Sequence, residues 1–333
     1  MNVFCKGKEV TVATFHGLTD GKGLMMFTEE ILHAYAAYMG DKNYIPELSE
    51  HEDINAEPFE QAREAFEKMK LPDIPAGKGF ADKDPFLIQE GFAGKDIKPC
   101  HVQIKADAGE YMKAAKALGV RPAAFLAAVY TKAVLKVMGE PDRKMKVAIP
   151  VDFREALEIP NTFRNCAMPP VMAELSPELA RADIRDIALF LQGVIEQRTS
   201  KAAGVMAVKA MADMTGQMPK LGYKEAVGLF KNFSSGPVFT FNASYITRIT
   251  ENDYSEFLDG IYAMYPSEGS QTVIEMIALP KHFCISINQG GETSFYVDAF
   301  CHVLQENGVS CEVEKILNGN TGYIELREYE KWL

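Results

Sequence analysis

The chain has 333 residues, of which 47% are hydrophobic and 24% are charged, so its composition is that of an ordinary globular protein. Its net charge of −11, without any cluster of basic residues, argues against nucleic acid as a partner. No apolar run approaches the ~18–20 residues of a membrane helix, and the first residues lack the pattern of a secretory signal. We therefore expect a cytoplasmic protein without a membrane span, and the length predicts two domains or one large two-lobed domain.

The six cysteines do not form a metal-binding motif. They are scattered along the chain without a Cys-x-x-Cys pair, whereas zinc sites usually contain such closely spaced pairs. Cys301 and His302 are adjacent, but they would point in different directions on a strand or on a helix. We expect free thiols and no bound metal.

The first predicted element is a strand over residues 8–16, where apolar and polar residues alternate. This strand would end at His16, with His16 on the same face as Val10 and Val12. A turn follows, in which Gly21 and Gly23 fit backbone conformations with positive φ.

A helix is predicted next, from Leu24 to Met39, with an apolar stripe and a terminating glycine. Residues 41–99 are acidic and rich in proline, and they contain one short helical piece at 57–70. This composition predicts an irregular segment that crosses between two lobes.

Regular patterns resume at residue 100. We predict a strand at 100–106, a helix at 107–119 that is capped by Asp107, and a mostly buried helix at 120–139. A strand at 144–153 ends near Pro150. The remaining predicted elements are one or two long helices within 176–211, a strand at 237–249, a helix or helix-rich turn at 252–265, two strands within 271–291, a helix at 294–308 and a strand at 309–317. The alternation predicts α/β layers, with a large sheet covered by helices.

On the spacing of residues alone, His16 is the best candidate for a catalytic residue. A histidine that follows a strand and precedes a glycine-bounded turn projects into the space where α/β proteins tend to place their sites. Its ordinary pKa of about 6.5 suits a general base, but it could equally be a structural histidine at the margin of a sheet. Asp20 could orient the imidazole, cap the helix or pair with a distant arginine, and capping or pairing suits a turn aspartate best.

The segment "FHGLTDGKGLMMFTEEILHAY" resembles the active-site segment of the chloramphenicol acetyltransferase-like superfamily. This superfamily includes nonribosomal peptide condensation domains and, closest in pattern, alcohol acetyltransferase-like proteins. Its signature, His-His-x-x-x-Asp-Gly, is matched by His16, Asp20 and Gly21, with Phe15 in place of the first histidine. Similarities continue in the family's order at "YMKAAKALGVRPAAFLAAVYTKAVLKV", "VAIPVDFREALEIPNTFRN" and "PVFTFNASY". The resemblance implies a two-lobed mixed sheet with flanking helices.

The resemblance also implies a reaction. In the family, the second histidine deprotonates an acceptor hydroxyl or amine, which attacks the thioester of an acyl-CoA or of a carrier-bound acyl group. By this resemblance the chain is an acyltransferase that moves an acyl group, expected to be acetyl, from CoA to an alcohol or amine. His16 would be the general base and Asp20 its structural partner, acyl-CoA would be a co-substrate, and no cofactor would be bound. Gly21, Arg154 and Asn242 are predicted as substrate-binding residues, although Asn242 also fits an ordinary polar strand residue.

Only fifteen residues precede His16, whereas family members carry several strands and helices there. The resemblance thus implies a truncated first lobe: residues 1–99 would be its remnant, with the motif and the crossing segment, and 100–333 the C-terminal lobe. Arg154 is a candidate substitute for the arginine that usually pairs with the motif's aspartate. An incomplete lobe would favour self-association or a partner chain. The alternatives are an inactive member that acts as a binding or assembly module, and condensation with a carrier-bound acyl group.

Overall fold

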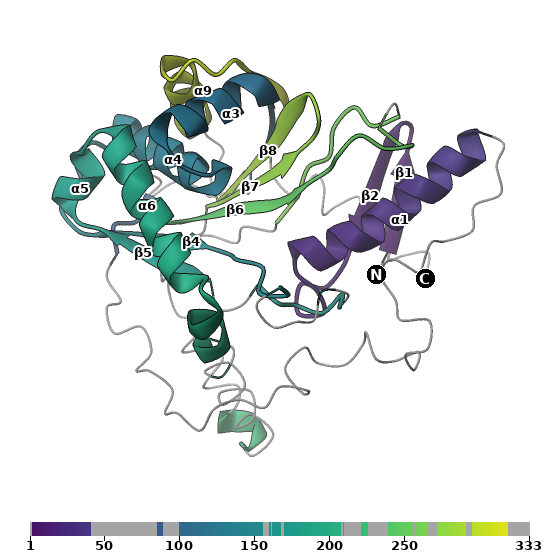
Figure 1. Cartoon of the computed structure of the whole chain (residues 1–333), viewed down its shortest axis with the longest axis horizontal. Coiled ribbons are helices and arrows are strands. Elements are labelled where there is room, and N and C mark those ends of the chain that lie inside the picture. The colour runs from purple at the N-terminus through teal and green to yellow at the C-terminus, as the bar shows by residue number, and fades with distance from the viewer. Residues whose placement is uncertain are drawn as a thin grey trace.

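The computed structural model describes residues 2–40, 85–88, 100–155, 160, 162–167, 170–207, 209, 221–225, 239–255, 257–265, 272–290 and 295–318. A seven-stranded sheet lies at its centre (Figure 1), with the strand order β5-β4-β6-β7-β8-β3-β9. β4, β6 and β7 are parallel to one another, and the other neighbouring pairs are antiparallel. The strands are β3 (Cys100–Asp107), β4 (Met145–Ile149), β5 (Val171–Leu175), β6 (Phe241–Arg248), β7 (Val273–Ala278), β8 (His282–Gln289) and β9 (Cys311–Asn318). The predicted mixed α/β class is therefore confirmed.

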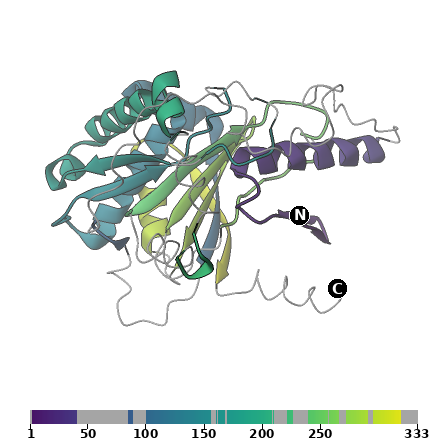
Figure 2. The same ribbon diagram turned by 90° about the horizontal axis from the view of Figure 1, so that it is seen from below.

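Helices cover one face of this sheet (Figures 1 and 2). They are α3 (Ala108–Leu118), α4 (Pro122–Met138), α5 (Pro177–Arg181), α6 (Ile184–Arg198) and α9 (Phe295–Glu306). Alternate strand residues, such as Ile274 and Met276 on β7, join the helices in one large apolar cluster.

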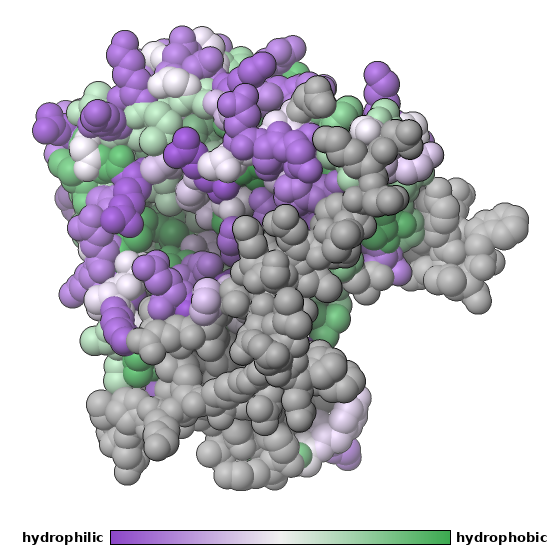
Figure 3. Space-filling view, turned by 45° about the vertical axis from the view of Figure 1, so that its right-hand side comes forward, coloured by the Kyte–Doolittle hydropathy of each residue, from purple (hydrophilic) through white to green (hydrophobic). Residues whose placement is uncertain are grey.

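In the space-filling view, hydrophilic side chains cover most of the upper part of the molecule, with hydrophobic ones scattered between them (Figure 3).

Local signals in the sequence determine where α3 and α4 begin and end. The Asp107 carboxylate accepts a hydrogen bond from the backbone N–H of Glu110 at 2.8 Å, which caps α3. Gly119 ends α3 in the left-handed conformation, with a φ of 78°, and Pro122 opens α4. Both helices were predicted, as was the burial of α4.

Helix α1 (Gly21–Met39) packs against the other face of the sheet. Met25 and Ala36 of α1 lie in a second apolar cluster with Ile277 of β7 and Cys284 of β8. No single helix in the described part of the chain is long and apolar enough to cross a membrane.

Several predictions near the N-terminus need correction. A hairpin of β1 (Asn2–Lys6) and β2 (Glu9–Ala13) replaces the single predicted strand, and β2 ends three residues before His16. His16 therefore shares no strand face with Val10 and Val12. The backbone reverses instead, because the N–H of Leu18 donates to the carbonyl of Phe15 at 2.9 Å.

Other boundaries also differ from the predictions. The edge strand β5 was not predicted. A helix or helix-rich turn was predicted at 252–265, where the described residues 252–255 and 257–265 contain turns and irregular backbone but no helix. The N–H of Ser255 bonds to the carbonyl of Asn252, whose side chain accepts from the N–H of Tyr254, and this pattern favours a turn. The helical piece predicted at 57–70 lies outside the described residues.

Candidate active site

His16 lies in an exposed turn between β2 and α1. Its ring nitrogen Nδ1 is 3.0 Å from the carbonyl oxygen of Thr19. A carbonyl only accepts hydrogen bonds, so Nδ1 carries the proton and donates it, and in the neutral ring Nε2 keeps its lone pair. The turn thereby selects the tautomer that a general base needs.

Asp20 is buried behind this turn and caps α1. Its Oδ1 accepts a hydrogen bond from the N–H of Gly23 at 2.8 Å, which satisfies one of the unpaired donors at the start of the helix. This cap explains why α1 begins at Gly21 and not at Leu24. The carboxylate thus contributes one of its contacts to helix formation, as predicted for a turn aspartate.

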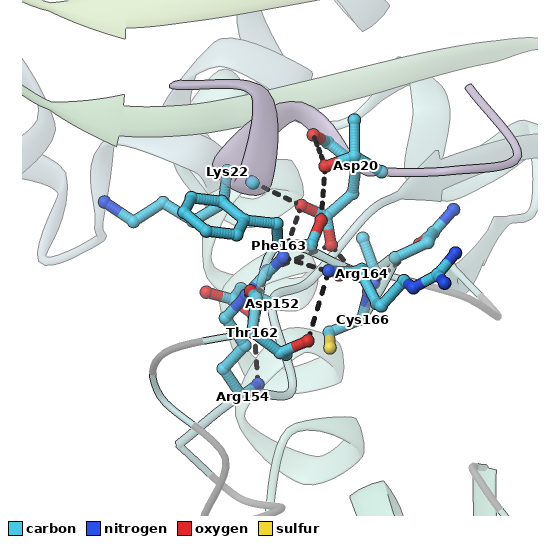
Figure 4. Close-up of polar contacts among 12 residues, drawn as sticks. Asp20, Lys22, Asp152, Arg154, Thr162, Phe163, Arg164 and Cys166 are labelled. Atoms are coloured by element: carbon cyan, nitrogen blue, oxygen red, sulfur yellow. Dashed lines mark hydrogen bonds and ion pairs between the residues drawn. The ribbon is translucent and has the colours of Figure 1, made fainter. Parts of the chain in front are cut away.

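Arg154 approaches the same carboxylate from the segment that follows β4 (Figure 4). Its two terminal nitrogens, Nη1 and Nη2, contact Asp20 Oδ2 and Oδ1 at 3.0 and 2.9 Å, which is a two-pronged ion pair. Both side chains are almost fully buried. The backbone N–H of Cys166 also donates to Asp20 Oδ2, at 2.6 Å. Arg154 is therefore the arginine that pairs with Asp20 in this chain.

The remaining nitrogens of Arg154 are also engaged. Nε donates to the carbonyl of Thr162 at 2.9 Å, Nη2 to the carbonyl of Arg164 at 2.7 Å, and Nη1 to Asp152 at 2.9 Å. Burial alone lowers the pKa of Arg154, but the hydrogen bond and charge of Asp20 outweigh it and raise the pKa, so the guanidinium stays charged. These contacts make Arg154 a positioning residue; the substrate contact predicted for it stays a prediction.

Gly21 and Gly23 have a role other than the one predicted. Neither has a positive φ, because both lie in the first turn of α1. Space for a side chain is limited instead: a Cβ on Gly21 would lie 3.2 Å from Cγ2 of Ile246 on β6, so Ile246 would have to shift. A Cβ on Gly23 would overlap the hydroxyl of Thr19 and the carbonyl of Phe163. The two glycines let α1 approach the sheet and the 162–166 segment, and the substrate role predicted for Gly21 stays a prediction.

His16 faces residues that sequence reasoning did not single out. Its ring meets the ring of Tyr265 edge-on, with centroids 5.6 Å apart. The backbone N–H of Tyr265 donates to Oδ1 of Asn288 at 3.2 Å, and Nδ1–H of His101 donates to the same oxygen at 2.6 Å. Asn288 lies on β8 and His101 on β3, so this chain of contacts links the His16 turn to the sheet. For His101 and Asn288, the signal in the sequence was the alternation of polar with apolar residues in "CHVQIK" and "CISINQ".

Asn242, the last predicted site residue, lies on β6. Its Oδ1 is buried and has no hydrogen-bond partner among the residues that the structure describes. Two surface hollows lie elsewhere: one of about 480 Å³ between α4, α5 and α9, and one of about 500 Å³ at the α3–α4 turn. Neither is lined by His16, Tyr265 or Asn242.

Comparison with known proteins supports this fold through structure rather than sequence. No protein-family model matches the chain, and no curated protein matches it by sequence. TRI101 of F. sporotrichioides in complex with coenzyme A and T-2 is similar, with a TM-score of 0.52 and 11% identity over 89% of this chain. TRI101 of F. graminearum with coenzyme A and T-2 mycotoxin gives a TM-score of 0.52 and 10% identity over 89% of this chain. The epimerization domain from the third module of tyrocidine synthetase B matches 88% of this chain and 66% of that one, with a TM-score of 0.45 and 12% identity.

The two TRI101 structures confirm the chloramphenicol acetyltransferase-like fold that the resemblance implied. This chain spans 65% of the length of each of them. The similarity concerns the fold, and the assignment of a reaction therefore depends on the geometry around His16.

Proposed function

We propose that this protein is an acyltransferase that moves an acyl group from acyl-CoA to a hydroxyl or amine, with His16 as the general base. The observation that carries the proposal is the hydrogen bond from His16 Nδ1 to the Thr19 carbonyl, which leaves Nε2 as the basic nitrogen. Coenzyme A bound to TRI101, which has the same fold, supports the choice of donor.

The proposed reaction needs one base and an activated carbonyl. Nε2 of His16 removes the proton of the acceptor while the acceptor's oxygen or nitrogen attacks the thioester carbonyl. The tetrahedral intermediate then collapses, the C–S bond breaks, and the CoA sulfur leaves with the proton that His16 had taken. The ion pair of Asp20 and Arg154 acts indirectly, because it holds the turn from which His16 projects.

Release of free CoA thiol from acetyl-CoA, measured with a panel of alcohols and amines, tests the proposal. His16→Ala should lower the rate by about 10²–10⁴-fold, the usual contribution of a general base. His302→Ala is the matched control, because His302 is exposed on α9 on the opposite side of the sheet. Unchanged activity in His16→Ala would refute the role of His16. A folded wild-type protein without transfer to any acceptor would favour the binding-module alternative.

A further inference from the structure

The face of the sheet that carries α1 becomes polar beyond that helix. Because strand residues alternate between faces, the neighbours of the apolar cluster residues point to the α1 side. The polar ones among these neighbours on β6, β7 and β8 form what we call the polar row: Asn242, Ser244, Glu275, Ser286 and Asn288. Val273 lies on the same face, between Asn242 and Asn288.

The members of the polar row are contiguous. In the register of the sheet, Glu275 lies directly beside Ser244 of β6 on one side and Ser286 of β8 on the other. Neighbouring strands are about 4.8 Å apart, so these three side chains can reach one ligand. Nδ2 of Asn288 lies 3.4 Å from Oε2 of Glu275 and connects it to the contacts of Tyr265.

Several polar atoms of this row lack protein partners among the described residues. Ser286 is fully buried, yet its hydroxyl makes no hydrogen bond, and the same holds for Oδ1 of Asn242. No lysine, arginine or histidine of the described chain forms an ion pair with Glu275. An unsatisfied buried polar atom costs about 1–3 kcal/mol, so native proteins retain such atoms mainly where a ligand or water satisfies them. Asn242, Ser244 and Glu275 remain partly exposed although they lie on central strands.

The polar row is also close to the proposed base. Tyr265 contacts the His16 ring, and its backbone N–H bonds to Oδ1 of Asn288, whose Nδ2 lies 3.4 Å from Oε2 of Glu275. Burial, with a smaller contribution from the charge of Glu275, raises the pKa of the Tyr265 phenol. His16 and Glu275 are therefore connected through Tyr265 and Asn288. Burial raises the pKa of Glu275 to about 7, as expected for a carboxyl without a cation beside it.

We infer that the polar row is the acceptor site of this protein, and that Glu275 binds an ammonium group of the acceptor other than the atom that is acylated. The inference rests on the proposed function and adds a substrate class to it: alcohols or amines that carry a second, cationic amine. The oxygens of Asn242, Ser286 and Glu275 can accept hydrogen bonds, and an ammonium group supplies three donors and a charge. The net charge of −11 also favours the approach of a cation.

Binding measured without any acyl donor tests the inference independently of catalysis. Calorimetry would compare 4-aminobutan-1-ol with 1-pentanol, which has similar length and no charge. The wild type should bind the amino alcohol more tightly than pentanol. Glu275→Gln should weaken amino-alcohol binding by about tenfold or more, the loss expected for a charge-assisted hydrogen bond, and leave pentanol unchanged. Glu312→Gln, on exposed β9, is the control that should behave as the wild type.

Two outcomes would overturn the inference. One is equal binding of the amino alcohol to the wild type and to Glu275→Gln. The other is wild-type binding of pentanol as tight as that of the amino alcohol, and this result decides the matter even if the variant does not fold. Intact amino-alcohol binding without acyl transfer would refute the proposed function alone and leave the cation site in place.

Discussion

The two faces of the central sheet are built from alternating residues of the same strands, yet they differ in chemistry beyond the part of the sheet that α1 covers. On β8, Ile285 and Ile287 are buried against the helices, whereas Ser286 and Asn288 face the side of α1 and His16. The helical face gains its stability from a closely packed apolar cluster. The opposite face keeps unpaired polar atoms, which weaken folding and are useful only if something binds to them. This difference is the reason why we place the proposed acceptor site on the α1 side of the sheet.

The largest expected effect concerns the ion pair under the His16 turn. Arg154→Met should lower the free energy of unfolding by about 3–5 kcal/mol, because Asp20 would remain as a buried charge without its partner. Urea denaturation measures this loss. The double variant Asp20→Asn with Arg154→Met should be more stable than Arg154→Met alone, since no buried charge is then left unpaired. If Arg154→Met alone were as stable as the wild type, the ion pair would not have this stabilising role.

The contrast between the faces can be tested with two adjacent residues of β8. Ile287→Ala should cost about 2–5 kcal/mol, because it leaves a cavity in the apolar cluster. Ser286→Ala should change the free energy of unfolding by less than about 1 kcal/mol, or raise it, because it removes an unpaired buried hydroxyl. Urea denaturation of both variants gives the comparison. Equal losses would show that the two faces contribute alike to stability.

A smaller effect should appear in the pH dependence of stability. The folded-state pKa of Glu275 is raised from 4.5 to about 7, so the folded protein holds this proton more tightly than the unfolded chain does. The contribution of Glu275 is therefore most favourable below pH 4.5 and is lost as the pH rises to about 7. The stability of the wild type relative to Glu275→Gln should fall over this window and level off above it. A constant difference would mean that Glu275 is not held in its neutral form.

The smallest effect concerns how closely α1 approaches the sheet. Gly21→Ala should destabilise the protein by about 1 kcal/mol, because the new Cβ lies against Ile246 and this contact outweighs the better helix propensity of alanine. In an Ile246→Ala background the same change should be neutral or stabilising. Thermal or urea unfolding of the four proteins in this cycle measures the coupling. Additive effects would show that Gly21 is not required for the approach.

Much of the fold could be predicted because its signals are local. The Asp107 cap, the left-handed Gly119 and the alternation in β8 each act within a few residues of chain. The short edge strand β5 carries a weak pattern, and its formation depends on pairing with β4. The β1–β2 hairpin was missed because its first strand is short and mostly exposed.

For the site, sequence identified residues but not their surroundings. His16 and Asp20 were singled out, whereas the strand end predicted for His16 is an exposed turn. Arg154 was only a candidate partner, since nothing local connects it with Asp20. Glu275 had a usable signal, a lone acidic residue within the apolar "TVIEMIA", but its link to Tyr265 through Asn288 follows from the tertiary structure alone.

The ion pair between Asp20 and Arg154 has a consequence for the order of folding. Its two members are 134 residues apart in sequence, and the Arg154 side comes after β3, α3, α4 and β4. Contacts of such long range form late, because the entropy of closing a long loop is lost before the contact is gained. A nascent or partly unfolded chain would therefore have local helical structure before it had an ordered His16 turn. Regain of the proposed acyl transfer during refolding should accordingly lag behind regain of helical structure.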